Sequence, residues 1–396
     1  MPSLVDIECR NTSRLGLLGS DYRGLRCEPL CEQGDLVAAG AAVMRDARRP
    51  QIVISAPAAG RIVKLERGAG RRLVALQIEA DASERVAQFT APGQQQDAQR
   101  TFLLESGSWA SLRTRPFGNI PDPDAQPAAI LVTAIDAAPQ APPVATLIDA
   151  FADEFSAAVS MLSRISEAPL YLCHAPEYRP PFDAASGAIC RAFSGGEAAG
   201  LPGRHIQALC PIGFSGADVW HIGYQETIAL GHLIVHGRPW LQRIVSLGGD
   251  AVKRPRCLQV TPGAAVDELL DGEVDDGPLD IFAGSALYGR RLGAVPGYLR
   301  AGQRQLTVNR SVADDGADDG TSALIPGDWL ERFAPPGIYP VPLLRALQLG
   351  DVERARELGA LELVEEDVAP LAAVCVSNSD YPLLLRRVLD QLEELR

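Results

Sequence analysis

The sequence contains no apolar run that approaches the roughly 18–20 residues a membrane-spanning helix needs. Positive charge is also scarce, because 37 Lys and Arg stand against 50 Asp and Glu and give a net charge of −13. This shortage argues against a nucleic-acid partner, since a phosphate backbone selects concentrated positive surfaces. Residues 1–20 have no basic start followed by an apolar stretch, so we expect no signal peptide and a cytoplasmic location.

The cysteines show no spacing typical of a metal site or a disulfide framework. The 8 Cys are spread singly over 396 residues, and only Cys27 and Cys31 lie close together. A single Cys-x3-Cys without a second pair does not indicate a metal or iron–sulfur site, and the scatter is typical of reduced thiols. With 46% hydrophobic residues, the chain is expected to form a soluble, acidic protein with several cores, at roughly 100–200 residues per domain.

Residues 1–85 predict short β-strands separated by Gly and Pro turns. The order of Gly34, Val37 and Gly40, followed by the stretch 54–62, resembles the half-barrel of lipoyl and biotinyl carriers. Those carriers place an acceptor Lys on the hairpin, where this chain has Arg-Asp-Ala-Arg-Arg-Pro at 45–50. A guanidinium stays protonated and is a poor nucleophile, so we expect a scaffold or docking surface without carrier chemistry.

Strands alternate with helices over residues 86–255, which predicts a mostly parallel α/β domain. The expected strands are 129–133, 170–173, 205–210 and 243–247, and the expected helices are 144–165 and 224–235. Residues 256–325 return to short elements and predict a small α+β module, whose acidic stretch 313–320 suits an exposed loop.

Residues 326–396 predict a helical domain. Asp351 is expected to cap one helix and Asp380 the last one, which has Pro382 in its first turn. The apolar stripe expected on the last helix is Leu385, Val388, Leu389, Leu392 and Leu395.

Two patterns that could carry chemistry are incomplete. The glycines at 195–203 fit neither a dinucleotide fingerprint nor a P-loop, so they predict turns. His232 and His236 are spaced like metal ligands, but Leu233 stands where a zinc-protease motif needs Glu and Gly237 ends the helix, which favours ordinary helix-end histidines.

Several strings match one family in chain order. They are 106–117 (SGSWASLRTRPF), 199–206 (AGLPGRHI), 219–229 (VWHIGYQETIA), 247–256 (LGGDAVKRPR) and 382–392 (PLLLRRVLDQL). The chain thereby resembles the A-subunit family of the Na+-translocating NADH:quinone oxidoreductases, the Na+-pumping respiratory complexes of bacteria. Colinear agreement over several unrelated strings is more specific than any one motif.

The resemblance implies an α/β multidomain fold. Its parts would be a lipoyl/biotinyl-like β half-barrel at 1–85, a Rossmann-like domain at 86–255, a β-grasp-like module at 256–325 and a C-terminal helical domain at 326–396. The family is similar to the electron-input subunit of the Rnf complex and to the flavin- and NADH-binding subunit of complex I, which hold FMN on a Gly-rich turn and an iron–sulfur cluster in the helical domain.

The residues of this chain do not suit either group. The turn at 106–117 has one Gly in its first half and bulky side chains around it, although flavin binding needs a close backbone approach. The helical domain has one cysteine, Cys375, although a four-iron cluster needs four thiolates. We therefore expect no tightly bound cofactor, and ubiquinone is the one candidate ligand.

The turn supplies the candidate site residues Trp109, Arg113, Arg115 and Phe117, with Asp136, Tyr224 and Gln225 as weaker additions. One interpretation is an aromatic and basic pocket that binds a quinone head group. The other is a degenerate flavin loop whose side chains fill the space, because an empty apolar cavity would destabilise the fold. No catalytic or metal-binding residue is expected.

The function implied by the resemblance is that of a peripheral subunit on the cytoplasmic face of the bacterial inner membrane. It would bind the membrane subunits of the complex and would not itself oxidise NADH. Two other hypotheses stay open, a cofactor-free adaptor of another electron-transfer complex and a soluble flavin- or nucleotide-dependent enzyme.

Overall fold

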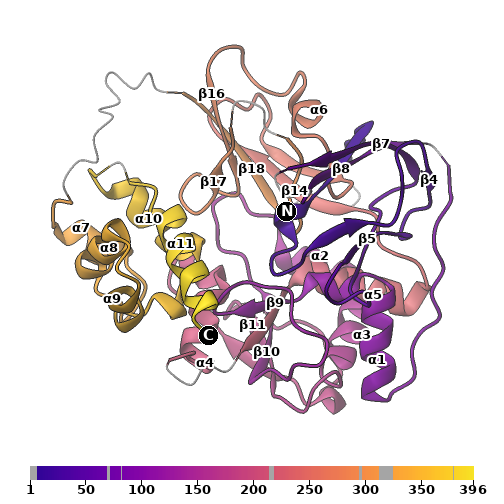
Figure 1. Cartoon of the computed structure of the whole chain (residues 1–396), viewed down its shortest axis with the longest axis horizontal. Helices are drawn as coiled ribbons and strands as arrows, with labels where there is room; N and C mark the ends of the chain where they lie inside the picture. Colours follow the sequence, from indigo (N-terminus) through magenta and orange to yellow (C-terminus); the bar gives the residue numbers. More distant parts are fainter. Residues whose placement is uncertain are drawn as a thin grey trace.

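Four β-sheets and a group of helices make up the described part of the protein (Figure 1). The computed structural model describes residues 7–68, 72–81, 83–213, 218–293, 297–311, 324–377 and 379–396. The acidic stretch 313–320 lies outside these residues. None of the helices in the described ranges has both the length and the apolar character needed to cross a membrane.

The N-terminal β domain consists of two small sheets. One has the strand order β2 (Arg14–Leu18), β8 (Leu73–Ala80), β7 (Gly60–Arg67) and β4 (Leu36–Val37), and the other β3 (Cys27–Pro29), β5 (Ala42–Asp46) and β6 (Val53–Ser55). Val43, Ile62 and Ile78 belong to the core of this domain and are fully buried. The short strands expected here are confirmed.

The parallel sheet is the centre of the second domain. Its order is β12 (Ile189–Ala192), β11 (Leu170–His174), β10 (Ala129–Ala134), β13 (Val219–Gly223) and β9 (Arg113–Arg115), and β9 runs antiparallel to its neighbour. All six residues of β10 are buried, as expected of a strand covered on both faces.

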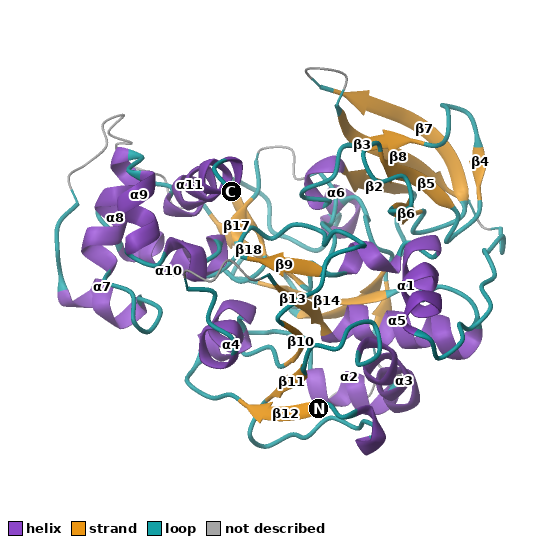
Figure 2. Ribbon diagram, turned by 60° about the horizontal axis from the view of Figure 1, so that its bottom comes forward, coloured by secondary structure: helices purple, strands orange, loops and turns teal. Residues whose placement is uncertain are grey.

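Helices cover both faces of this sheet (Figure 2). One side carries α1 (Gln96–Glu105), α2 (Val144–Ala150), α3 (Ala152–Leu162) and α5 (Tyr224–His236), and the other carries α4 (Pro202–Leu209). The prediction of a strand at 205–210 is therefore wrong. Pro202 starts a helix because its fixed φ suits the first turn, and Ile206 and Leu209 then share one helical face.

A six-stranded sheet forms the third part. Its order is β1 (Glu8–Cys9), β15 (Arg256–Val260), β14 (Arg243–Gly248), β18 (Gln305–Arg310), β16 (Leu279–Ala283) and β17 (Arg290–Arg291), with α6 (Val266–Leu270) beside it. Two of these strands lie outside residues 256–325, the expected bounds of this domain. β14 precedes residue 255, and β1 comes from the N-terminal segment and pairs in parallel with β15.

The C-terminal domain is helical, with α7 (Asp328–Phe333), α8 (Pro340–Leu349), α9 (Val352–Glu357), α10 (Glu365–Val374) and α11 (Tyr381–Glu394). The expected caps are confirmed, because the Asp351 carboxylate accepts a hydrogen bond from the Arg354 amide and Asp380 from the Leu383 amide. Leu395 is 77% exposed, so its place in the apolar stripe was wrong. It follows the last helical turn, where the chain has left the packed face.

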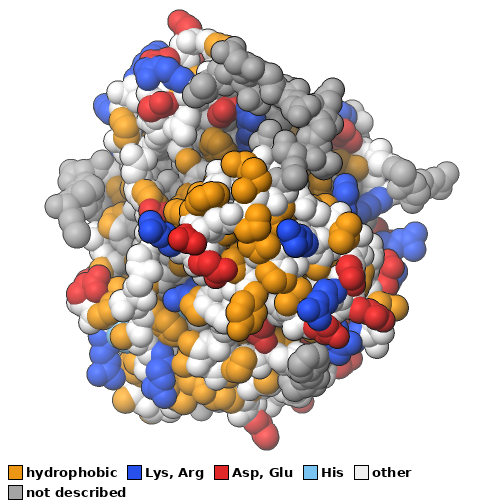
Figure 3. Space-filling view, turned by 90° about the vertical axis from the view of Figure 1, so that its left-hand side faces the viewer, with side chains coloured by type: hydrophobic (Ala, Val, Ile, Leu, Met, Phe, Trp, Pro, Cys, Tyr) orange, Lys and Arg blue, Asp and Glu red, His pale blue; other side chains and the backbone are white. Residues whose placement is uncertain are grey.

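The hydrophobic core is divided between the domains. The largest group of buried side chains runs continuously through the N-terminal β domain, the parallel sheet and the six-stranded sheet, whereas the C-terminal helices have a core of their own. Seen from the side of these helices, the surface carries apolar side chains among scattered charges (Figure 3). Exposed apolar residues of this domain include Trp329, Tyr339 and Leu349.

Candidate functional site

The carboxyl edge of the parallel sheet brings together residues from three parts of the chain. Asp136 follows β10, and Tyr224 follows β13, its neighbour in the sheet. Ligands of open α/β sheets bind at this edge. Arg304, just before β18, donates from Nε to Asp136 Oδ2 over 3.2 Å, and its guanidinium carbon lies 5.4 Å from the centroid of the Tyr224 ring.

Tyr224 is held by its surroundings as a neutral phenol. It is fully buried, and burial together with the nearby Asp136 carboxylate raises the pKa of its hydroxyl, while Arg304 opposes them. A phenol that keeps its proton can donate a hydrogen bond throughout the physiological pH range.

Arg115 and His221 form a second part of the site. β9 pairs antiparallel with β13, and Arg115 Nε donates to His221 Nε2 over 3.3 Å. Burial, then the charges of Arg115 and Arg113, hold the pKa of His221 well below its ordinary value, so the imidazole is neutral and can accept this bond. Side chains alternate between the two faces of β13, so His221 points to one face while Trp220 and Ile222 point to the other.

Arg115 has an unused donor. The residue is 6% exposed, and its Nη1 atom is buried without a hydrogen-bond partner among the described residues, whereas Nη2 lies 3.6 Å from the Glu366 carboxylate of α10. An unpaired buried donor is costly unless something accepts from it. Asp367, the next residue of α10, is also buried at this place and abuts Gly203 at the start of α4.

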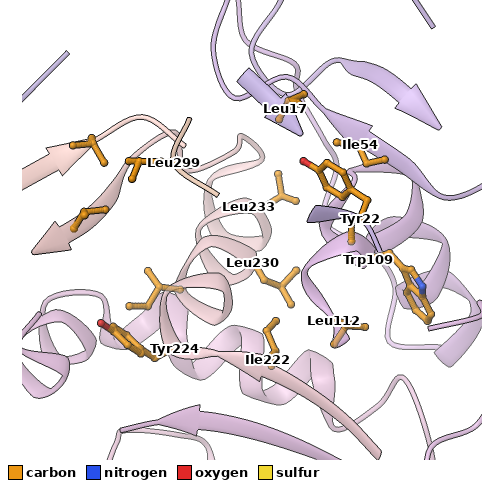
Figure 4. Packing of buried hydrophobic residues seen from close by; sticks show 14 of the residues in the cluster. Leu17, Tyr22, Ile54, Trp109, Leu112, Ile222, Tyr224, Leu230, Leu233 and Leu299 are labelled. Atoms are coloured by element: carbon orange, nitrogen blue, oxygen red, sulfur yellow. The ribbon is translucent and has the colours of Figure 1, made fainter. Parts of the chain in front are cut away.

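The structure does not bring all the predicted site residues together. Figure 4 shows Trp109 and Tyr224 on opposite sides of the packed cluster. Trp109 is completely buried, its Nε1 donates to the Pro121 carbonyl over 2.9 Å, and its ring lies edge-on to Trp220 at 5.5 Å. The Arg100 guanidinium lies against both indoles, at 5.8 and 5.6 Å.

The other members of the turn also have structural partners. Arg113 donates to three backbone carbonyl oxygens, of Ala110, Leu112 and Asp21. Phe117 belongs to the core of the C-terminal helices. The Gln225 amide, which donates to the carbonyl and accepts from the amide of Ile244, links α5 to β14.

The candidate group consists of Arg115, Asp136 and Tyr224 from the sequence prediction, joined by His221, Arg304, Glu366 and Asp367. Sequence reasoning missed the last four. Strand alternation could have placed His221 opposite Trp220, but no local pattern links Arg304, Glu366 or Asp367 to β10 and β13. In the described residues no group of three or more His, Cys, Asp or Glu side chains is arranged to hold a metal ion.

Domain-family comparisons define the class of protein to which this architecture belongs. Three models match in chain order, described as the NqrA N-terminal barrel-sandwich hybrid domain (residues 3–81), the NqrA second alpha/beta domain (94–239) and the NQRA C-terminal domain (244–293). The third match begins at β14, in agreement with the sheet order.

Curated relatives agree over nearly the full length. The A-subunit of the Na(+)-translocating NADH-quinone reductase of Pseudomonas aeruginosa (strain UCBPP-PA14) is 34% identical, with 97% of this chain and 94% of the relative covered. The corresponding protein of Neisseria meningitidis serogroup B is 33% identical, with 96% and 94% covered. The chain belongs to the NqrA family, the A-subunits of the Na+-translocating NADH-quinone reductases, as the sequence motifs predicted.

Among solved structures, the crystal structure of an NAD+-reducing [NiFe]-hydrogenase in the air-oxidized state aligns with a TM-score of 0.42 and 15% identity. It covers 76% of this chain and 61% of that chain.

Proposed function

We propose that this chain works as the peripheral, cofactor-free NqrA component of its complex, docked on the membrane subunits at the cytoplasmic face of the bacterial inner membrane. It would hold no flavin or iron–sulfur cluster and would not be catalytic in isolation. Membership of the Na+-translocating NADH-quinone reductase family provides the enzymatic context. The second domain would be Rossmann-like, the third β-grasp-like, and the N-terminal domain lipoyl/biotinyl-like.

The observation that carries the proposal is the packing of the turn at 106–117. A flavin would need space and backbone access at this turn, but Trp109 fills it, with no exposed surface, between Trp220 and Arg100. In the helical domain, the Cys375 thiol lies in a buried hydrogen-bonded group with the hydroxyls of Ser377 and Tyr381. One thiol in such a group does not provide a cluster site.

Affinity purification from native membranes tests this role. The tagged chain should bring down membrane subunits of a Na+-pumping NADH:quinone reductase, and the purified chain should show no flavin absorbance and no NADH oxidation. Recovery of a different electron-transfer complex would support the adaptor hypothesis instead. A yellow protein that oxidises NADH alone would contradict the proposal and support the soluble flavoenzyme.

A second candidate function is quinone binding beside Arg115, and its Nη1 atom, which has no hydrogen-bond partner among the described residues, is the observation that favours it. A quinone carbonyl oxygen could accept from this donor, and the neutral phenol of Tyr224 is a further donor. The turn residues Trp109, Arg113 and Phe117 would then act only by supporting the strand that carries Arg115.

Binding of a short-chain ubiquinone to the full chain separates the two functions. Arg115→Lys keeps the charge beside Glu366 but loses the Nη1 donor, and it should weaken binding by about tenfold, the loss of one hydrogen bond to a charged group. Arg354→Lys, at an exposed ion pair with Glu357, is the matched control and should leave binding unchanged. Equal affinity in both variants would exclude Arg115 as a quinone ligand without affecting the assembly role.

A further inference from the structure

The boundary between the C-terminal helices and the parallel-sheet domain has polar and apolar contacts, and Leu361 of the helical domain packs against the buried residues of β10 and α4. Phe117 is the one buried residue from outside the helical domain that joins the core of these helices in the described chain. The remaining contacts include hydrogen bonds and ion pairs. The Glu362 carboxylate accepts from the amides of Ile212 and Gly213 over 3.1 and 2.5 Å, and Arg386 Nη1 donates to the Phe117 carbonyl over 2.9 Å. Boundaries of this kind permit relative domain motion.

Asp367 is the buried carboxyl group at this boundary. It is 4% exposed, and its Oδ2 accepts a hydrogen bond, of 2.8 Å, from the Val364 amide of its own helix end. Across the boundary it abuts Gly203 so closely that a Cβ there would lie 2.6 Å from Oδ2 and 2.9 Å from Oδ1. No side chain in the described ranges forms an ion pair with it, although Glu365 pairs with Arg386 and Glu366 with Arg115.

Charged and titratable groups face Asp367 from every side of the contact. Arg115 approaches from β9, Glu365 and Glu366 belong to the same helix, and Tyr288, itself near Arg204 of α4, comes from the segment between β16 and β17. Burial is the largest cause that raises the pKa of Asp367 to about 7, Glu366 and Glu365 raise it further, and Arg115 opposes them. Near neutral pH the docked carboxyl group is therefore divided between its acid and its anion.

We propose that Asp367 is a proton-dependent latch, which holds the C-terminal helices against α4 and β9 when it is protonated and weakens this contact when it ionises. The geometry explains why. A neutral carboxyl group can be buried against Gly203 at modest cost, but a carboxylate without a cation partner gains solvation when the boundary opens. Opening would expose Arg115, which is 6% exposed in the docked state.

The sign follows from linkage. The pKa of Asp367 is higher in the docked state than in an exposed state, so docking is strongest at low pH and weakens as pH rises from the ordinary value of 3.8 through about 7. With these two pKa values, the equilibrium constant for docking decreases by about 30-fold between about pH 5.5 and 8.5.

Hydrogen exchange of the full-length chain at about pH 5.5, 7 and 8.5 tests the latch, with rates converted to protection factors to remove the intrinsic pH effect. In the wild type, the amides that donate to Glu362 across the boundary (Ile212 and Gly213) should lose about 30-fold in protection as pH rises, while amides inside α11 should not change. Asp367→Asn should make the boundary amides insensitive to pH.

Asp380→Asn is the matched control, because Asp380 also accepts a hydrogen bond from an amide of its own helix but is exposed and away from the boundary. In this variant the protection factors of the boundary amides should show the same pH dependence as in the wild type. A wild-type boundary with constant protection would overturn the proposal whether or not Asp367→Asn folds. A folded Asp367→Asn variant whose boundary amides keep the pH dependence of the wild type would overturn the proposal as well.

Discussion

The packing of Trp109 makes a quantitative prediction for Trp109→Ala. The side chain is completely buried, and truncation of a buried Trp or Phe to Ala costs about 3–5 kcal/mol. The variant also loses the 2.9 Å hydrogen bond to the Pro121 carbonyl, about 1 kcal/mol, and the edge-on contact with Trp220, about 1 kcal/mol. Because these contributions overlap, we expect a total loss of about 4–5 kcal/mol in the free energy of unfolding.

Chemical denaturation followed by far-UV circular dichroism measures this loss without relying on the deleted fluorophore. Trp109→Phe should retain most of the apolar contact but lose the indole hydrogen bond. Its free energy of unfolding should therefore lie between those of the wild type and Trp109→Ala, about 1–2 kcal/mol below the wild type. Trp329→Ala is the control, because Trp329 is 42% exposed in α7 and its loss should cost less than about 1 kcal/mol. A loss below about 1 kcal/mol in Trp109→Ala, together with lost quinone binding, would refute the packing argument and restore the pocket interpretation.

Two further predictions concern α5 and α4. Gly231→Ala should destabilise the chain by about 2–3 kcal/mol in thermal or urea unfolding, because its Cβ would lie 1.7 Å from the Glu154 carbonyl oxygen of α3. Gly293→Ala should be neutral, because a Cβ there would meet no atom of the described residues within 4 Å. His205 is buried, and burial is the main cause that lowers its pKa from 6.5 to about 4. At pH values between about 4 and 6.5 the imidazole is therefore neutral in the folded protein and takes up a proton when the protein unfolds. The wild type should therefore lose about 3 kcal/mol relative to His205→Gln as pH falls from 6.5 to about 4, and parallel curves for both proteins would contradict this.

Local signals in the sequence predicted several helix ends of the C-terminal domain well, whereas the expected helix 144–165 is wrong, because α2 and α3 are separate helices that meet at Phe151. Asp351 and Asp380 act through neighbouring backbone amides and cap helices as expected, and Gly350, in the left-handed conformation, ends α8. The stretch 205–210 misled because its branched and apolar residues suit a strand, while the decisive residue, Pro202, lies just outside it.

The site was harder to predict because long-range contacts assemble it. Trp109 and Phe117 lie close together in the chain, yet they belong to different cores. Arg304 reaches Asp136 across 168 positions of the chain, and Glu366 comes from a different domain from its partner Arg115. The family motifs indicated the segment 106–117 as a candidate, but which of its side chains join the candidate group depends on strand pairing that spacing does not reveal.

The pairing of β1 with β15 bears on how the chain is made. Glu8 lies opposite Leu258, so the first described strand is synthesised about 250 residues before its partner. At roughly 5–20 residues per second on the ribosome, this segment waits roughly 12–50 s with its edge unpaired. The six-stranded sheet is therefore completed late in synthesis, and a nascent chain stalled before residue 256 would leave its leading strand available to chaperones or to proteases.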